Sequence, residues 1–540
     1  MFKFVRYALL TYSLAVSGSA LGTTYYVAAT GLDTNSGTSK TSPWLHAPGM
    51  TGCTGTCAST KPQPGDSVIL RGGDTWHFSS SAGTVGLPWT WTWSGNATTT
   101  TGAVGGCVGS GCIYIGVDTT WYNSSVCGSS FCRPKMNGDN PLSTSNVSSC
   151  AYTIGNNLIY QRGQSYTIWD NFEMLGFCMA GQSGGEYVHH YGCYNTYKNF
   201  YMHGWTLAPD STYGITWGDQ LGGFAGTTSG SCPDGTTYPF TGNEFAYNIF
   251  DGSDSSPQGL ETHHFDCYNV HHSYMTYVGG NNCNNMHLVH DTVIEYANED
   301  GSVALSTSIA DHGDTWQFYG EANSNNYFYN NVVRHIGTVA GIGINIIFEP
   351  KAGYTDTVFN NLIYDVTSGN FLTVSPSGSG GNVRLINNTF QMYASLSSIK
   401  CVGAGACSLS QNNHFVTDAT AYTSGSIYNA PTTTTTDLLQ TTSAATAAGY
   451  TSSSQYTPST GTSPTVGVGT SWASSCAGLT DAGAATACAS ATTLACTYVL
   501  GSGLLNCPGQ QAVARSSPSD IGAYSYSGLA APTGLSATVR

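Results

Sequence analysis

The chain of 540 residues contains 67 glycines and 19 prolines, a density of turn-forming residues that excludes an all-helical fold. Only 8% of the residues are charged, and 15 basic against 30 acidic side chains give a net charge of −15, so no basic surface is available to neutralise a nucleic-acid backbone. Hydrophobic residues make up 40% and aromatic residues 12% of the chain, which is enough for a large core. These values predict a globular, strand-rich protein that does not bind nucleic acid.

The N-terminus has the order of a secretory signal peptide. Lys3 and Arg6 precede an apolar run at residues 7–16, and small residues follow up to Ala20. We therefore expect cleavage after Ala20 and an exported protein, either secreted or held at the cell surface. The apolar run is too short to remain in a bilayer, and no later stretch approaches the roughly 20 apolar residues that a membrane helix needs, so no membrane span is expected.

All 18 cysteines lie beyond this segment, and several are close neighbours along the chain. The close pairs are Cys53 with Cys57, Cys107 with Cys112, Cys127 with Cys132, and Cys401 with Cys407. An even number at such spacings in an exported chain predicts local disulfides. The sequence contains no Cys-x-x-Cys, which disfavours a zinc site built from cysteines, and it leaves open whether isolated cysteines such as Cys178 are reduced.

Short strand signals open the chain at residues 25–28 and again within the turn, apolar run and turn of residues 64–73. An internal repeat follows, in which Asn-rich segments recur before short apolar runs. Asn331, Asn361, Asn388 and Asn413 are spaced 30, 27 and 25 residues apart, which fits one coil of a solenoid per repeat. We interpret these asparagines as structural, because stacked amides can satisfy the backbone of the turns at successive levels.

The opening around residues 64–73 and the repeat resemble secreted right-handed parallel β-helix proteins of the pectate-lyase-like superfamily. Near the other end, residues 519–524 (Ser-Asp-Ile-Gly-Ala-Tyr) resemble an ending common in bacterial members of this group. The resemblance implies an all-β fold, a right-handed parallel β-helix. Many proteins of this kind are polysaccharide lyases or related carbohydrate-active enzymes, so the resemblance also implies a polysaccharide substrate or ligand.

Four segments are expected along the chain. They are a signal peptide at 1–20, a parallel β-helix with an N-terminal lead-in at 21–430, a Thr/Ser/Ala-rich C-terminal segment with a terminal strand at 431–530, and a tail at 531–540. The composition of residues 431–465 indicates a loosely packed spacer. The tail resembles the first strand of a fibronectin type III module, or is a linker.

Polar chemistry gathers in the central coils, because eleven of the 14 histidines lie between residues 189 and 335. Four segments, 271–277, 313–319, 342–348 and 370–374, are expected to stack in register. That alignment places Asp314 and Trp316 on one outward face, with His272 and Tyr274 above and Asn345 below. A tryptophan-rich stretch at Trp89, Trp91 and Trp93 is interpreted as one packed strand face rather than a sugar platform.

His312 and Asp314 are the strongest catalytic candidates, because side chains two apart on a strand point the same way and can exchange protons or hold a metal. Glu349 and Lys351 follow an apolar strand and add an acid and a base to the catalytic set. The residues expected to contact a sugar are His272, Tyr274, Trp316, Gln317 and Tyr319. Each also has a plainer interpretation, as a hydrogen-bonded turn, a solvated charge or a core ring.

Glu299 and Asp300 lie side by side before Gly301, in a turn that suits a hard cation with oxygen ligands. The ion expected there is Ca²⁺, and a plain polar turn is the alternative.

Together these features predict a monomeric extracellular enzyme that cleaves a polysaccharide, by β-elimination or by hydrolysis with paired carboxylates. The scarcity of Lys and Arg disfavours elimination unless Ca²⁺ bridges the acidic groups. A non-catalytic adhesin or structural β-solenoid that binds glycans remains the alternative, because one fold hosts both kinds of function.

Overall fold

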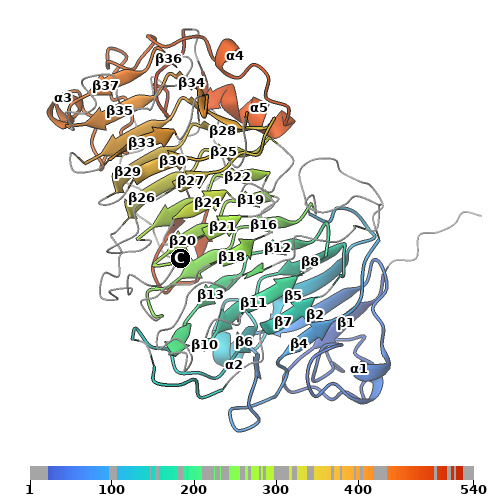
Figure 1. The fold of residues 1–540 in the computed structure, drawn as a ribbon. Coiled ribbons are helices and arrows are strands. Elements are labelled where there is room, and N and C mark those ends of the chain that lie inside the picture. The colour runs from blue at the N-terminus through green and yellow to red at the C-terminus, as the bar shows by residue number, and fades with distance from the viewer. Residues whose placement is uncertain are drawn as a thin grey trace, which may run out of the picture.

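The structure is a computed structural model, and it describes residues 22–96, 106–145, 147–152, 157–161, 163–180, 186–190, 192–208, 224–225, 232, 242–255, 262–265, 269–278, 281–283, 287–296, 315–318, 325–336, 346–366, 370–376, 380–393, 397–401, 405–418, 434–491, 496–507, 513–515 and 518–526. Strands dominate these segments, and they stack in coils along one axis from the blue N-terminal end to the orange C-terminal end (Figure 1).

The first sheet has 13 strands, all paired in parallel with their neighbours. Its strands are β1 (Thr24–Val27), β2 (Ser67–Gly72), β5 (Ile113–Tyr122), β8 (Thr167–Asp170), β12 (Thr196–Lys198), β16 (Glu244–Ala246), β19 (Asn269–His271), β22 (Leu288–His290), β25 (Tyr327–Tyr329), β28 (Thr355–Phe359), β31 (Asn382–Ile386), β34 (Cys407–Gln411) and β36 (Thr434–Thr435). The strand signals at residues 25–28 and 64–73 correspond to β1 and β2.

The second sheet has 12 parallel strands. They are β3 (Thr75–His77), β6 (Lys135–Asn137), β9 (Glu173–Leu175), β13 (Tyr201–His203), β17 (Ile249–Asp251), β20 (Tyr274–Thr276), β23 (Val293–Glu295), β26 (Val332–Ile336), β29 (Leu362–Val366), β32 (Thr389–Met392), β35 (His414–Thr417) and β37 (Leu438–Gln440).

The third sheet has six parallel strands, β18 (Thr262–Phe265), β21 (Asn281–Cys283), β24 (Trp316–Phe318), β27 (Ile346–Phe348), β30 (Asn370–Val374) and β33 (Ser397–Cys401). A four-stranded parallel sheet lies before it, with strands β4 (Trp89–Trp91), β7 (Asn157–Gln161), β11 (Glu186–His190) and β15 (Phe224–Ala225). A short parallel pair joins β10 (Cys178–Ala180) to β14 (Thr206–Ala208).

The order of strands along the chain shows how a coil is made. β28, β29 and β30 belong to the first, second and third sheets in turn, and the next strand, β31, returns to the first sheet beside β28. Each coil thus adds one strand to each sheet, and every neighbour in the three sheets is parallel. The chain is therefore a parallel β-helix, which confirms the predicted fold class.

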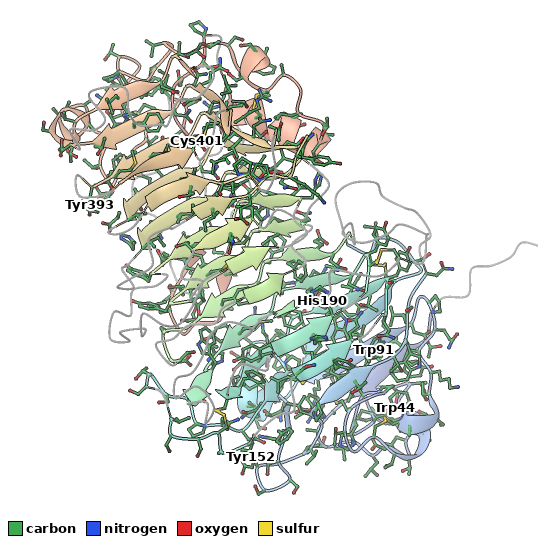
Figure 2. All side chains as sticks on the ribbon, viewed as in Figure 1. Trp44, Trp91, Tyr152, His190, Tyr393 and Cys401 are labelled. Carbon is green, nitrogen blue, oxygen red and sulfur yellow. A yellow bond between two sulfur atoms is a disulfide. The ribbon has the colours of Figure 1, made fainter. Side chains whose placement is uncertain are left out.

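Side chains alternate between the interior and the outer surface along each strand. Val358, Ile363 and Leu372, one from each sheet of a single coil, all lie in one continuous hydrophobic core. Trp89 and Trp91 belong to the same core and are fully buried against Trp169, with ring centroids 5.0 and 5.6 Å from it (Figure 2). The tryptophan-rich stretch is thus core packing, as predicted.

The corner between the first and second sheets is built by paired polar residues. The first residue of each pair has a positive φ, as at Asn330 and Asn360 (both 57°), and the second is buried. The Oδ1 of Asn361 accepts a hydrogen bond from the backbone N of Asn331 at 3.0 Å, and its Nδ2 donates to the Asn388 Oδ1 at 3.0 Å. Asn388 repeats this pattern with Asn413. The predicted asparagine ladder is confirmed.

Replacing Asn361 with Ala is expected to destabilise the fold by about 2 kcal/mol or more, because two buried backbone groups of the preceding coil, the N–H of Asn331 and the carbonyl of Phe328, lose their partners. Denaturant unfolding of the variant measures the effect. Asn506→Ala, at an exposed position in β40 (Leu505–Asn506), is the matched control and is expected to unfold like the wild type. Equal stability of both variants would contradict a supporting role for the ladder.

Eight disulfides cross-link the described residues, and no cysteine among them is free. All four predicted close pairs are confirmed. Cys178, whose state the sequence left open, is bonded to Cys150. Such a number of disulfides fits an extracellular protein. None of the helices in the described ranges combines the length and hydropathy needed to cross a membrane.

The segment after residue 431 is packed rather than a loose spacer, so that expectation is wrong over its described part. Strands β36 and β37 extend the first and second sheets by one more coil. Beyond them lie α3 (Thr442–Ala447), α4 (Trp472–Ser475), α5 (Ala482–Cys488) and the antiparallel pairs β38 (Ser490–Ala491) with β41 (Val513–Ala514) and β39 (Thr497–Tyr498) with β40. Two further short helices, α1 (Gly55–Ser59) and α2 (Ser124–Cys127), lie near the other end.

This C-terminal segment runs back along the outside of the coils. Ala484 and Cys488 of α5 pack on Tyr329 and Phe359 of the first sheet. The buried Arg515 donates through Nη2 to the Asn360 Oδ1 at 2.7 Å, which ties the segment to the corner ladder. Further back, the Arg133 guanidinium donates to the carbonyl of Gly503. The composition failed to predict this packing because small Thr, Ser and Ala side chains fit flush against a rigid surface.

The boundaries expected at residues 20 and 531 stay predictions, because both flanking segments lie outside the described residues.

Candidate functional site

The third sheet carries two of the residues that the sequence singled out, Trp316 and Gln317, and Glu349 directly follows its strand β27. Trp316 pairs with Ile346, and Ile347 with Thr373, so the segments 313–319, 342–348 and 370–374 stack where they are described. The fourth segment, 271–277, was placed wrongly. It contains the last residue of β19 in the first sheet and the whole of β20 in the second sheet. The strand that pairs with β24 on that side is β21, with Asn282 opposite Gln317.

Trp316 points into the core instead of outward. Its side chain is 1% exposed and packs against Phe318 and Phe328, with ring centroids 6.0 and 6.2 Å away. A ring without an exposed face cannot stack on a sugar, so the structure contradicts the expected contact. The alignment was one residue out of phase, and in a strand such a slip exchanges the inner and outer faces.

Tyr274 is also buried, at 1% exposed, on the outer face of the second sheet. Its hydroxyl donates to the Glu295 carboxylate, and the Arg334 guanidinium lies 3.4 Å from the same oxygen. Its ring packs against Tyr498 of the C-terminal segment. Tyr274 therefore joins that segment to the coils, and its burial speaks against a sugar contact.

Gln317 does point outward, between the inward rings of Trp316 and Phe318. Its Nε2 makes a long hydrogen bond of 3.5 Å to the Oε2 of Glu349, the residue that follows β27. Ile347 and Thr373 continue the outward row on the next two coils. Glu349 and Lys351, the predicted acid and base, are both half-buried near this row.

Two polar atoms in this row are buried without a hydrogen-bond partner, the Oε1 of Gln317 and the Oγ1 of Thr373. Both residues are only 4% exposed. Both atoms are closed off from solvent, and an orphaned buried polar atom costs about 1–3 kcal/mol.

The remaining predicted residues lie outside the described part of the chain. These are His312, Asp314 and Tyr319, and the expected cation ligands Glu299 and Asp300. Their roles, and the Ca²⁺ expected at the last two, stay predictions. Along the chain Asp314 precedes the first residue of β24 by two positions, and Tyr319 follows its last residue directly.

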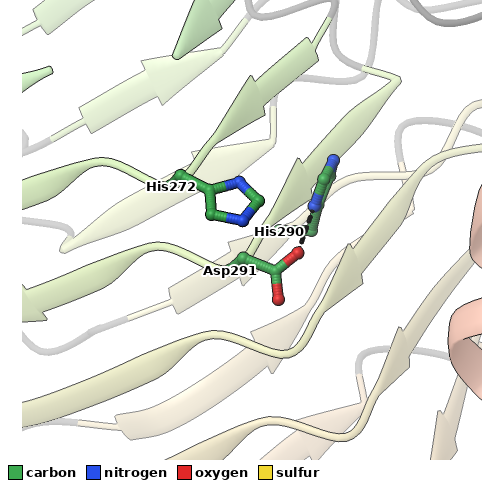
Figure 3. A group of neighbouring side chains, drawn as sticks. All are labelled: His272, His290 and Asp291. Carbon is green, nitrogen blue, oxygen red and sulfur yellow. Dashed lines mark hydrogen bonds and ion pairs between the residues drawn. The ribbon is translucent and has the colours of Figure 1, made fainter. Parts of the chain in front are cut away.

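His272 lies in a group that the sequence did not single out. It sits at the corner between the first and second sheets with His290 and Asp291, and one ligand atom from each of the three lies within 4.8 Å of the others (Figure 3). The Nδ1 of His290 is 2.6 Å from the Asp291 Oδ2. On the other side, the Nδ1 of His272 is 2.8 Å from the Nδ1 of His271, whose Nε2 is 3.0 Å from the Glu244 Oε1.

Burial keeps the imidazoles of His272 and His290 neutral at pH 7. It lowers the pKa of His272 to about 4, and it also lowers the pKa of His290 against the opposing effect of Asp291. A departure from the repeat could have revealed the group, because His272 and Asp291 stand at the corner position that asparagine fills in the later coils.

Apart from the group at His272, a charged cluster lies on the outer face of the second sheet, nearer the N-terminus. His203 places Nδ1 2.7 Å from the Asp254 Oδ2 and Nε2 3.4 Å from the Glu173 Oε1, and Lys135 reaches the same Glu173 oxygen at 2.7 Å. Burial alone would lower the pKa of His203, but the two carboxylates raise it to about 9. This imidazole is therefore charged at pH 7 and unsuited to act as a general base.

Not every histidine of the central coils is a site residue. His190 is fully buried in the core between Tyr197 and Phe245, and burial lowers its pKa to about 3 (Figure 2). It behaves as a neutral packing residue.

The His203 cluster predicts a pH dependence of stability. Because the folded pKa of about 9 lies above the ordinary 6.5, the ion pairs stabilise the fold fully below about pH 6.5, and this stabilisation is lost as the pH rises through 9. Its size is of the order of 3 kcal/mol. Chemical unfolding at pH 6 to 10 is expected to show a decline that His203→Gln flattens, and an unchanged slope in the variant would refute the assignment.

Comparisons with known proteins identify no family for this chain. No protein-family model and no curated protein sequence matches the chain. Among solved structures, a GH136 lacto-N-biosidase from Eubacterium ramulus is 11% identical, with 77% of this chain and 68% of that chain covered at a TM-score of 0.44. A rhamnogalacturonan lyase is 14% identical, with 73% and 87% covered at 0.38. An alginate lyase from Paenibacillus sp. str. FPU-7 is 12% identical, with 60% and 87% covered at 0.32. At these values the likeness carries no functional argument.

Proposed function

We propose that the protein is an extracellular carbohydrate-active enzyme that cleaves a polysaccharide along the outer face of the third sheet. The observation that supports this most is the contact between β24 and the end of β27 on that face, where the Nε2 of Gln317 lies 3.5 Å from the Oε2 of the half-buried Glu349. An extended polysaccharide would lie along such a face, because the coils repeat about every 4.8 Å.

The rigidity of the coils suits this role. Gln317 sits on a strand that pairs with a neighbour on both sides, between the core rings of Trp316 and Phe318, so its position is fixed before a ligand arrives. Preorganised groups on strands hold a reacting bond more accurately than groups on loops. The disulfides support an extracellular location, where such substrates occur.

Glu349 is the acid or base that this proposal assigns among the described residues. Its Oε2 accepts a hydrogen bond from Gln317, which orients the carboxylate. His312 and Asp314 complete the proposed set, since the chain runs from them directly into β24. With two carboxylates the reaction is hydrolysis, whereas Lys351 and a cation at a uronate would favour β-elimination.

A panel of uronate-containing and neutral polysaccharides, each with and without added Ca²⁺, tests the proposal. Ultraviolet absorbance of an unsaturated product together with new reducing ends indicates elimination, and reducing ends alone indicate hydrolysis. Binding without either product would instead favour a non-catalytic glycan-binding protein.

Glu349→Gln is expected to lower kcat by about 10² or more, because it removes a proton-transferring group while keeping the size and the contact with Gln317. Asp314→Asn is expected to act likewise. Asp118→Asn, on β5 at the N-terminal end of the first sheet and paired with Lys40, is the control and is expected to retain activity. Full activity of Glu349→Gln with an unchanged melting temperature would remove Glu349 from the mechanism.

A further inference from the structure

We propose that His272, His290 and Asp291 form a binding site for one divalent transition-metal ion, with zinc as the reference ion. The site lies at the corner between the first and second sheets, outside the row on the third sheet, so it stands or falls independently of the proposed enzymatic function. Within the described residues it is the one group of three or more histidines, cysteines and carboxylates close enough to share an ion.

The three side chains converge from two neighbouring coils. Figure 3 shows one ring nitrogen of His272 turned toward the pair formed by His290 and Asp291. Their ligand atoms lie within 4.8 Å of one another, whereas ligands at about 2.0–2.2 Å from one ion lie roughly 3–4 Å apart. Small rotations of the side chains close this difference, so the backbone need not move.

Hydrogen bonds behind the site select the tautomer that a metal needs. The Glu244 carboxylate can only accept, so the Nε2 of His271 donates to it, and in the tautomer with this one ring proton the Nδ1 of His271 accepts from the Nδ1 of His272. The lone pair of His272 is therefore on Nε2, the nitrogen that faces the other two ligands. An imidazole oriented through its second nitrogen is the usual support of a metal-binding histidine.

His290 can serve in the same way after a change of tautomer. Without an ion its Nδ1 donates to the Asp291 Oδ2 at 2.6 Å. When the ion binds Nδ1 and the carboxylate, the single imidazole proton moves to Nε2, and the ring stays neutral. No net proton release or oxidant is needed for this step.

The repeat itself marks the site as a departure from the pattern. In the later coils the corner position with positive φ is asparagine, as at Asn330, Asn360, Asn387 and Asn412. His272 and Asp291 take the same position with φ of 50° and 53°. Histidine has no backbone advantage over asparagine there, and Tyr247 on the preceding coil also departs from asparagine, so the argument for the site rests on the convergence of the side chains.

The C-terminal segment fixes the backbone of two ligands. In the Cys496–Cys507 disulfide, the Sγ of Cys507 lies 3.5 Å from the His272 carbonyl oxygen, and the Sγ of Cys496 lies 3.8 Å from the Asp291 carbonyl oxygen. The disulfide therefore packs against the backbone of both ligand residues and keeps them in place before an ion binds.

The donor set determines which ions bind. Two imidazole nitrogens and one carboxylate suit Zn²⁺, Co²⁺ or Ni²⁺, whereas Ca²⁺ and Mg²⁺ prefer oxygen ligands. Three protein ligands leave at least one coordination position for water or for a ligand from solution.

Calorimetric titration of the metal-free full chain with Zn²⁺ tests the site. In a second measurement, Co²⁺ is added in place of Zn²⁺, and its visible spectrum reports nitrogen and oxygen ligands. We expect one ion per chain and a higher melting temperature on binding. Ca²⁺ added in place of Zn²⁺ is expected to give no such binding. Failure of the wild type to bind Zn²⁺, or binding without a Co²⁺ spectrum typical of imidazole ligation, would overturn the proposal.

His272→Asn and Asp291→Asn are the test variants, because asparagine is the residue that the fold already accepts at this corner. Each is expected to weaken Zn²⁺ binding at least tenfold while the metal-free melting temperature stays close to that of the wild type. His271→Gln, which acts through His272, is expected to weaken binding by about tenfold as well.

His335→Asn is the matched control, since His335 also has a positive φ (54°) and an aspartate partner, Asp365. Its affinity for Zn²⁺ is expected to equal that of the wild type. If His272→Asn and His335→Asn bind alike, the ion is held elsewhere and the assignment is wrong.

Discussion

The amide ladder at the corner between the first and second sheets is the interaction on which the rest of the structure depends. A backbone that turns sharply at every coil buries N–H and C=O groups that water cannot reach, and these groups need partners. The Asn361 side chain serves the N–H of Asn331 and the carbonyl of Phe328 on the preceding coil, and the Asn388 side chain does the same for Asn361 and Val358. Because each amide serves two coils, the ladder also sets the register in which all three sheets stack, and with it which side chains face outward.

That dependence explains what the sequence could and could not predict. The Asn pairs repeat at the spacing of one coil, and interior residues flank them, as Val358 does before Asn360 and Phe390 after Asn388, so the solenoid could be derived. The prediction for Trp316 was wrong because its segment contains no such Asn pair. The outward phase of β24 is fixed by pairing with β27 and β21, and a single slipped residue in the alignment turned a core ring into an expected sugar platform.

The corner group at His272 was missed for a related reason. In the sequence, His271-His272 and His290-Asp291 are two dipeptides 19 residues apart, and nothing local says that they lie on neighbouring coils. The signal was that asparagine is replaced at the corner position of these two coils. This replacement can be recognised only after the asparagine positions of the other coils are known. Tyr274 was misjudged because the partner that covers it, Tyr498, comes from a segment whose composition suggested no packing at all.

The path of the C-terminal segment also bears on how the molecule is assembled. Arg133, on an early coil, contacts Gly503, and Arg515 contacts Asn360, so a segment that follows the coils in the sequence is fastened to coils that precede it. A solenoid can otherwise add or lose coils one at a time from either end. A segment that contacts many coils couples them, so that fraying at one end has to break contacts in the middle first. Unfolding in this protein should therefore be slow and cooperative rather than stepwise.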